Sequence, residues 1–450
     1  MHKDERGHAM TTDSADAAAA LDKALHNFIR WKADIVPNLK AALDADPGFA
    51  FGHTAMGLIL HFARNAAFAP RIADALQAAE KADGNLTERE RLYRDALAAS
   101  ARGEVAQAVA AYETILAAHP TDLLAVRLAQ MELFWIGEMR WSSEINDRVE
   151  SYWTHDIPGY GTYLSCRAFD LEETHHYQEA ERLGRESVEL DPTDVWGTHA
   201  VAHVLIQEGR HAEGIAWLEG LKDNWDEANQ MKLHLWWHRC LFHLERGEFD
   251  AALDIHDSWV RNRELELVKA MPDLYIDMQN GASLLLRLEL RGVDVGDRWA
   301  ELAELALHRL DDHTNPFTSS HFAVILAATG HFAEADRLVQ SMRDFAAAGQ
   351  GTLAPRFAVA AIPAAQAAIA HRKAEHQRVV DLLLPARQML WQMGGSHAQR
   401  DLFFLLLADS ARALGRADIL GIVLDDIEWA GFTDPAYRIG YRDAAAAAAL

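Results

Sequence analysis

Apolar residues along this chain recur mainly at intervals of three and four positions, which is the spacing of one face of an α-helix. No segment keeps up the alternation of apolar and polar residues that predicts a β-strand, and no Asn-Gly or Asp-Gly turn joins two β-branched runs. Ala, Leu, Glu and Arg are abundant, whereas the 450 residues include only 12 Pro. The pattern therefore predicts an all-α protein.

The predicted helices repeat in pairs. A phrase in which Gly closes one helix and a small residue follows five positions later occurs at Gly103, Gly209, Gly247 and Gly330. The small residue lets two helices approach closely, and a proline such as Pro120 ends the second helix because it cannot donate to the helical ladder. This phrase resembles the tetratricopeptide (TPR) repeat, an antiparallel helix pair of about 34 residues. Stacked pairs are expected to form a superhelix with a concave groove.

We expect one such superhelix over residues 11–440. Residues 1–10 are expected to form a flexible lead-in, and Thr12 or Ser14 can cap the first helix. The Ala-rich residues 441–450 are expected to form a tail that extends the last helix or frays.

The first helix of each TPR pair lines the concave face, and the positions of the closing glycines place two segments rich in His and Trp there, WGTHAVAH and HLWWH. Because adjacent helical residues point about 100° apart, Trp237 is expected to face the groove and Trp236 the core. The residues predicted to line the groove are Trp196, His199, His203, His234, Trp237, His238, Ser320, His321 and Arg127.

Two histidine pairs stand out among these residues, His199 with His203 and His234 with His238. Their spacing of four places both imidazoles of a pair on one helix face. Such pairs can bind Zn²⁺, but no Asp or Glu stands beside either pair and no HExxH motif occurs. Two other interpretations stay open: core histidines that hydrogen-bond within the fold, or a metal-free polar pocket in which neutral imidazoles exchange protons.

Further candidate residues follow in the C-terminal half. In GGSHAQRD, Ser396 can cap a helix, and His397, Arg400 and Asp401 then crowd its first turn, either as a local ion pair or reaching into the groove. Asp277 could orient a histidine, and Arg287 could hold a carboxylate, although both could equally be packing residues of a helix.

The charge balance excludes several classes of partner. The chain has 43 Lys and Arg against 67 Asp and Glu, a formal net charge of −24, which repels nucleic acids and anionic membrane surfaces. No apolar run approaches the roughly 18–20 residues needed to span a bilayer, and the N-terminus lacks the apolar core of a signal peptide. With only two cysteines, Cys166 and Cys240, we expect a cytoplasmic protein without a disulfide framework.

Several phrases resemble the tetratricopeptide repeat protein 38 family. They are DPGFAFGH, PGYGTYL, WGTHAVAHVLIQEGRHAEGIAWL, HLWWHRCLFHLERGEFDAAL, LRLELRGVDVGDRW and GGSHAQRD, and together they run from about residue 10 to about residue 430. The chain departs from the family pattern at LIQEGR and at LLLRL. The resemblance implies a helical TPR-like superhelix and no established reaction.

We therefore expect a concave pocket, lined by Trp196 and Trp237, that binds a small organic ligand. If it carries a reaction, that reaction is cofactor-free acid–base chemistry such as hydrolysis, elimination or isomerisation. Arg287 or Arg400 would hold an anionic group of the ligand. The alternatives are a TPR scaffold that binds a protein or peptide, and a His-ligated metalloenzyme; the oligomeric state stays open. The histidines expected to act in catalysis are His199, His203, His234, His238 and His397.

Overall fold

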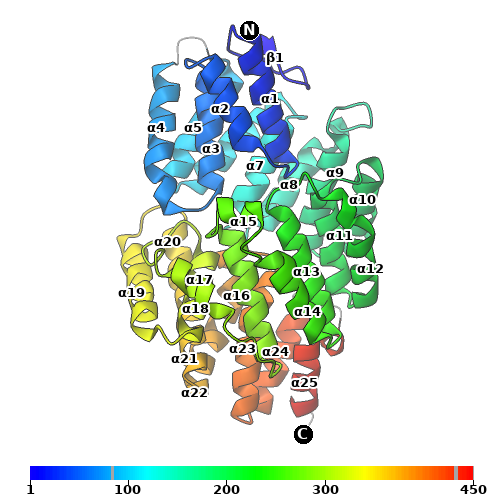
Figure 1. Cartoon of the computed structure of the whole chain (residues 1–450), viewed down its shortest axis with the longest axis vertical. Coiled ribbons are helices and arrows are strands. Elements are labelled where there is room, and N and C mark those ends of the chain that lie inside the picture. The colour runs from blue at the N-terminus through cyan, green and yellow to red at the C-terminus, as the bar shows by residue number, and fades with distance from the viewer. Residues whose placement is uncertain (83–85, 430–433, 449–450) are drawn as a thin grey trace. The chain divides into compact units, whose positions relative to one another are not determined.

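The computed structural model is built almost entirely of helices, and it describes residues 1–82, 86–429 and 434–448 (Figure 1). The strands in this part of the chain are two short ones, β1 (His2–Lys3) and β2 (Ala9–Met10), which pair antiparallel before the first helix. The predicted all-α class is confirmed.

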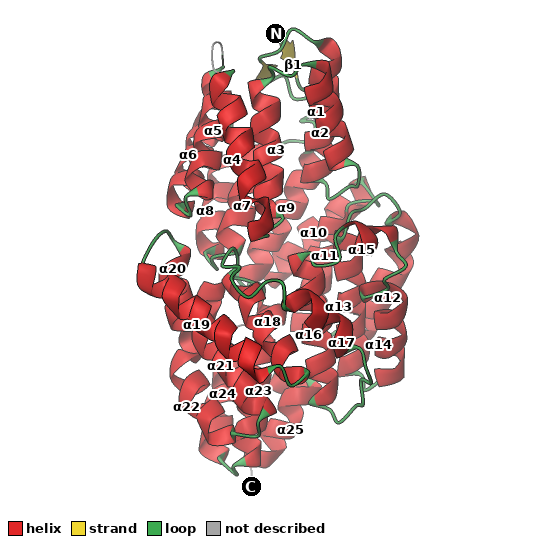
Figure 2. Cartoon of the chain, turned by 60° about the vertical axis from the view of Figure 1, so that its left-hand side comes forward, coloured by secondary structure: helices red, strands yellow, loops and turns green. Residues whose placement is uncertain are grey.

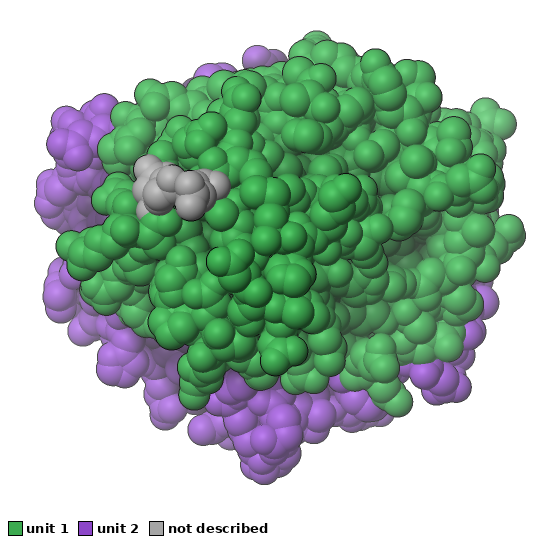
Figure 3. Space-filling view, turned by 90° about the horizontal axis from the view of Figure 1, so that it is seen from above, with its two compact units in different colours: residues 1–134, 138–200, 224–229 green, residues 135–137, 201–223, 230–450 purple. Residues whose placement is uncertain are grey.

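Two compact units divide the chain (Figure 3). Unit 1 comprises residues 1–134, 138–200 and 224–229, and unit 2 comprises residues 135–137, 201–223 and 230–450. The division falls inside one continuous helix, α11 (Val195–Gln207), which starts in unit 1 and ends in unit 2.

The other helices of unit 1 are α1 (Ala15–Ile29), α2 (Ile35–Ala45), α3 (Ala50–Phe62), α4 (Ala69–Lys81), α5 (Glu88–Ala101), α6 (Val105–Ala118), α7 (Leu123–Phe134), α8 (Met139–Val149), α9 (Tyr160–Glu173) and α10 (Tyr177–Leu190). Those of unit 2 are α12 (His211–Leu221), α13 (Met231–Glu245), α14 (Phe249–Ile255), α15 (Glu266–Ala270), α16 (Tyr275–Glu289), α17 (Trp299–Ala306), α18 (Pro316–Ala328), α19 (Phe332–Ala348), α20 (Leu353–Arg356), α21 (Ile362–Arg372), α22 (His376–Ala386), α23 (His397–Ala413), α24 (Ala417–Trp429) and α25 (Ile439–Ala448). Short 3₁₀ and π turns extend or link some of them.

Within each unit, consecutive helices pack as antiparallel pairs, for example α9 with α10 and α21 with α22 (Figure 2). The turn inside a pair needs one residue with a positive φ, which glycine adopts without strain. Gly209 (φ 70°) and Gly330 (φ 77°) supply it where the sequence phrase placed them. In two pairs whose turns lack glycine, His175 (φ 68°) and Ala374 (φ 55°) take the same conformation. These pairs are TPR-like, as the repeated phrase predicted.

The small residue in the repeated sequence phrase stands where the second helix of a pair packs closely against a neighbouring helix. A Cβ atom added to Gly214 on α12 would lie 2.2 Å from the ring of Phe242 on α13, a distance at which the buried ring must move. The corresponding residues Ala108, Ala180, Ala252 and Ala335 are fully buried. The sequence phrase therefore predicted a packing constraint correctly.

Both predicted caps form where the sequence suggested them. The Ser14 side chain accepts a hydrogen bond from the backbone of Ala17 at the start of α1. Ser396 and Gln399 form a reciprocal capping box at the start of α23. Of the predicted tail, residues 441–448 belong to α25, and residues 449–450 lie outside the described part of the chain.

The expectation that no apolar run approaches the length of a membrane span was wrong for one continuous helix, Leu353–Arg372, whose 20 residues are long and apolar enough to cross a membrane. In the structure 61% of its apolar window is buried inside the protein. A buried core helix of a soluble protein has the same length and composition.

Candidate functional site

A histidine pair on α13 and an asparagine on the adjacent helix α16 form the centre of the candidate site in unit 2. Asn280 Oδ1 lies 2.8 Å from His234 Nδ1, so this nitrogen carries the hydrogen and donates it. His234 Nε2 then has a lone pair, and His238 Nε2 donates to it at 3.2 Å. The chain of bonds orients both imidazoles and leaves the lone pair of His238 on Nδ1.

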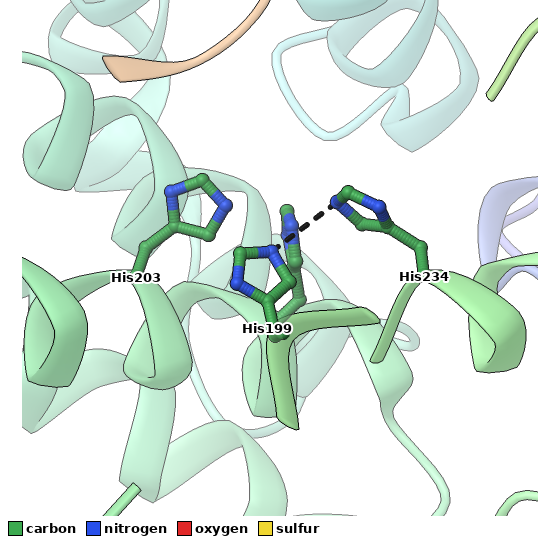
Figure 4. Close-up of side chains that lie close together, drawn as sticks. His199, His203 and His234 are labelled. Carbon is green, nitrogen blue, oxygen red and sulfur yellow. Dashed lines mark hydrogen bonds between the residues drawn. The ribbon is translucent and has the colours of Figure 1, made fainter. Parts of the chain in front are cut away.

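His203, from the second half of α11, joins these two histidines. Its ring centroid lies 4.6 Å from that of His238, and each of the three imidazoles offers a nitrogen within 4.8 Å of the others. Figure 4 shows the imidazoles of His203 and His234 extending from different helices, and it also labels His199, one turn before His203 on α11. All four histidines are buried. Three of the four predicted histidines, His203, His234 and His238, therefore form a buried cluster in unit 2.

The two neighbouring tryptophans of α13 point in different directions, as their helical spacing requires. Trp237 is fully buried and its ring stacks on His234, with centroids 5.0 Å apart and planes 12° apart. Trp236 stacks instead on the partly exposed Trp259. Trp237 thus lies against the histidine cluster and Trp236 does not.

Burial keeps the imidazoles of His234 and His238 neutral. Loss of water lowers the pKa of His234 to about 3, although its hydrogen bond to Asn280 acts in the opposite direction. Loss of water, with the neighbouring imidazoles, also places the pKa of His238 well below its usual value. At neutral pH both side chains are therefore uncharged hydrogen-bond partners.

The low pKa of His234 predicts that acid destabilises the protein. Since this group binds its proton near pH 6.5 when unfolded and near pH 3 when folded, the unfolded state takes up protons first and stability falls as the pH drops from 6.5 toward 3. At pH 5 the loss from this one residue is about 2 kcal/mol. His234→Gln should therefore reduce the stability lost between pH 7 and pH 5, measured by urea denaturation, whereas the exposed control His155→Gln should leave it unchanged. An equal loss in the wild type and His234→Gln would contradict this assignment.

Asp277 on α16 is a buried carboxylic acid of unit 2 with a strongly raised pKa. Its side chain is fully buried, and neither carboxyl oxygen has a hydrogen-bond partner among the described residues. Burial raises its pKa to about 7; the charge of Arg261 opposes this rise and that of Glu301 adds to it. An unpaired carboxyl that titrates near neutral pH is typical of functional sites rather than of packing.

Other polar atoms of α13 and α16 are also buried without a partner in the described part of unit 2. They include the indole nitrogen of Trp237 and the side-chain amide nitrogen of Asn280. Buried polar atoms in folded proteins nearly always make a hydrogen bond. Several buried atoms without a partner on two adjacent helices therefore indicate a place for bound water or a ligand.

Arg287 and Asp401 belong to a separate buried network of unit 2. Arg287 donates to the Ala398 carbonyl at 2.8 Å and lies 3.7 Å from Asp401. Asp401 also accepts hydrogen bonds from Arg438, at 2.6 Å, and from the Tyr441 hydroxyl. Arg438 in turn binds Glu245 on α13 at 2.8 Å. The network joins α13, α16 and α23 to the C-terminal helix α25.

The remaining candidates of unit 2 lie on α18 and α23. His321 is fully buried and donates from Nδ1 to the Phe317 carbonyl at 2.8 Å, and burial lowers its pKa to about 4. Ser320 donates to the Pro316 carbonyl at 3.0 Å. Arg400 donates to the Gly395 carbonyl and contacts the half-buried His397 at 3.3 Å. These contacts fix the local turns of their helices.

Two candidates, Arg127 and Trp196, lie in unit 1. The guanidinium of Arg127 lies 4.9 Å from the ring centre of Trp196 and 5.7 Å from that of Trp31. His199 lies in the same aromatic surroundings, 4.8 Å from Trp196 and 5.4 Å from Phe169 between ring centres. The first half of α11 therefore contributes to a cluster of aromatic rings around one arginine.

Among the described residues of unit 2, two groups of side chains have donors suited to a metal ion. His203, His234 and His238 offer three buried imidazole nitrogens, with the Nε2 atoms of His234 and His238 facing each other. His371, His376 and Asp409 form a second, half-buried group whose donor atoms lie within 4.8 Å of one another. Two imidazoles and a carboxylate can hold Zn²⁺.

The cysteines have little reactivity. Burial raises the pKa of the Cys166 thiol to about 12, and the Cys240 thiol is also buried and donates to the Ala252 carbonyl. Buried thiols with a raised pKa are poor nucleophiles.

Four residues of these networks were missed in the sequence: Asn280, Glu245, Arg438 and Tyr441. Asn280 stands one helical turn after Asp277, a spacing that could have indicated a shared polar face. Glu245 and Arg438 are 193 positions apart, so no local pattern connects them.

No protein-family model matches the chain. Among solved structures it is similar to the human IFIT1 dimer with m7Gppp-AAAA, at 12% identity over 98% of this chain and 96% of that chain, with a TM-score of 0.41. It is also similar to the structure of Naa15/Naa10 bound to HypK-THB, at 12% identity over 96% of this chain and 67% of that chain, with a TM-score of 0.26. The paired helices and their turns make this chain a TPR-like helical repeat protein.

Proposed function

We propose that unit 2 binds a small organic ligand beside α13 and α16. The observation that carries this proposal is a group of buried polar atoms that have no partner among the described residues: both carboxyl oxygens of Asp277, the indole nitrogen of Trp237 and the amide nitrogen of Asn280. They comprise donors and acceptors, so the ligand carries both kinds of group. The stacked rings of Trp237 and His234 supply the flat apolar wall that small-molecule sites commonly have.

Acid–base chemistry at this site is assigned to Asp277 first. A general acid or base is most effective when its pKa lies near the working pH, and the pKa of Asp277 is raised to about 7. His234 and His238 are neutral at this pH and serve as oriented hydrogen-bond partners. Hydrolysis, elimination and isomerisation all need one such proton transfer, and the side chains favour none of the three.

A thermal-shift screen against organic acids, amines and amides tests the proposal. A ligand that binds only the folded state raises its melting temperature. A compound that shifts the wild type should lose its effect in Trp237→Phe, which removes the indole donor, and keep it in Trp236→Phe, since Trp236 stacks on Trp259 away from the cluster. Equal shifts in both variants, or shifts from peptides alone, would favour the scaffold function instead.

A bound metal ion is the second candidate function, and one distance favours it. The facing Nε2 atoms of His234 and His238 are 3.2 Å apart, close to the spacing of two nitrogen ligands around Zn²⁺. Asn280 accepts the hydrogen of the other His234 nitrogen, as partners of metal-bound histidines commonly do. Metal analysis of the purified protein belongs in the same screen. If the wild type holds one equivalent of Zn²⁺ and His238→Gln holds none, the cluster is a metal site and the organic-ligand proposal is wrong.

Three broader expectations remain part of the proposal. The motifs HAVAH, HLWWH and GGSHAQRD support membership of the tetratricopeptide repeat protein 38 family. The net charge of −24 supports a protein that binds neither nucleic acid nor membranes. Two buried thiols are consistent with the reducing cytoplasm, and fractionation of the cells that make the protein would test this location.

A further inference from the structure

Arg127, on α7 of unit 1, is a buried arginine, and two nitrogens on one edge of its guanidinium make no hydrogen bond to the described residues. Its side chain is fully buried, and Nη1 donates to Gln130 Oε1 at 2.9 Å. Nε and Nη2 have no hydrogen-bond partner among the described residues. These two nitrogens form one side of the planar guanidinium, where two parallel N–H groups match the two oxygens of a carboxylate. Buried charged groups are normally paired, so an open edge at this depth indicates a missing partner.

A second layer of hydrogen bonds fixes the arginine in this orientation. Gln130 Nε2 donates to Asp170 Oδ1 at 2.7 Å and to the Cys166 carbonyl at 2.8 Å. The other oxygen of Asp170 accepts from Ser142 at 2.8 Å and from Asn146 at 2.6 Å. Because Gln130 is held at both ends, it binds the Nη1 side of Arg127 and directs the Nε/Nη2 edge elsewhere.

Aromatic rings surround the guanidinium. The rings of Trp31 and Trp196 stack on each other with centroids 5.2 Å apart, and both lie within 6 Å of the guanidinium carbon. Phe169 packs against Trp196 at 4.6 Å between ring centres. Cation–π contacts hold the charge without neutralising it, and the low-dielectric surroundings strengthen any ion pair that the open edge makes.

We propose that unit 1 binds the carboxylate of a small organic acid on the Nε/Nη2 edge of Arg127, with the body of the acid against the aromatic rings. A carboxylate supplies two coplanar acceptors for the Nε and Nη2 atoms, which have no partner among the described residues, and it brings a negative charge into direct contact with the guanidinium. A neutral amide of the same shape supplies one acceptor and no charge. This site consists of unit 1 residues only, so it does not rest on the function proposed for unit 2.

Matched acids and amides test the site directly. Benzoate and acetate should each raise the melting temperature of the wild type by about 2 °C or more at saturation, and benzamide and acetamide should not. Calorimetric titration should show at least a tenfold weaker binding of benzoate to Arg127→Lys, which keeps the charge and loses the two-pronged edge. Arg127→Gln should remove the binding. The exposed control Arg102→Gln, whose side chain pairs with Glu104 in the same unit, should bind benzoate as the wild type does.

Three results would overturn the proposal: equal shifts from acid and amide, undiminished benzoate binding in Arg127→Gln, or no shift from either acid in the wild type. The comparison of acid with amide uses the wild type alone, so it remains decisive if a variant fails to fold. Loss of benzoate binding in Arg127→Gln but not in Trp237→Phe separates this site from the one proposed in unit 2.

Discussion

Asp277→Asn is expected to stabilise the protein at pH 8 and to remove ligand binding from unit 2. The carboxyl group titrates near pH 3.8 when unfolded and near pH 7 when folded, so between these values the folded state holds the extra proton. Stability from this group is complete below pH 3.8 and is lost as the pH rises through 7. Between pH 5 and pH 8 the wild type should lose about 2–3 kcal/mol that the variant keeps. Urea denaturation at both pH values measures the difference.

Asp170→Asn in unit 1 is the matched control. Burial also raises the pKa of Asp170, to about 6, but this carboxylate accepts hydrogen bonds from Gln130, Ser142 and Asn146. An amide cannot accept all of them, so this variant should be less stable than the wild type. Opposite signs for the two substitutions would mark Asp277 as a residue retained for function at a cost in stability. A loss of stability at pH 8 in Asp277→Asn would show that its carboxylate has a partner.

Asp401→Asn is expected to be strongly destabilising. Asp401 is fully buried and is the carboxylate that lies between Arg287 and Arg438. Removing its charge takes the ion-pair partner from Arg287 and one of two from Arg438, which keeps its pair with Glu245, and breaking a buried pair in this way costs about 3–5 kcal/mol. Thermal or urea denaturation measures the loss, with Glu179→Gln as the control. Glu179 makes an exposed pair with Arg182, so its loss should cost less than about 1 kcal/mol. Similar effects of the two substitutions would show that the Asp401 network is not a structural element of unit 2.

The sequence predicted the features that follow from local periodicity. The helix pairs, the positive φ of their turn glycines and the close approach at Gly214 all depend on residues within one repeat. The different directions of Trp236 and Trp237 follow from helical geometry alone. The caps at Ser14 and Ser396 are equally local. These features could be predicted because neighbouring positions determine them.

The partners of the candidate residues could not be predicted in the same way. His234 depends on Asn280, 46 positions later, and Asp401 depends on Arg438 and Tyr441 on another helix. The sequence identified Asp277 and Arg127 as polar residues on helix faces, but whether their side chains have partners depends on the packing of several helices. The division of α11 between two units is likewise a property of contacts far apart in the chain.

The contacts of α25 give unit 2 a particular response to mechanical force. In a stack of helix pairs, most pairs touch only their neighbours in sequence, so a pull on one end should peel them away one after another. Arg438 and the backbone of Ile439 are bonded to Glu245 on α13, and Tyr441 is bonded to Asp401 on α23. A pull on the C-terminus must therefore break these hydrogen bonds before any helix pair of unit 2 can unfold. A single-molecule stretching trace should begin with one high rupture force, followed by smaller and more regular steps.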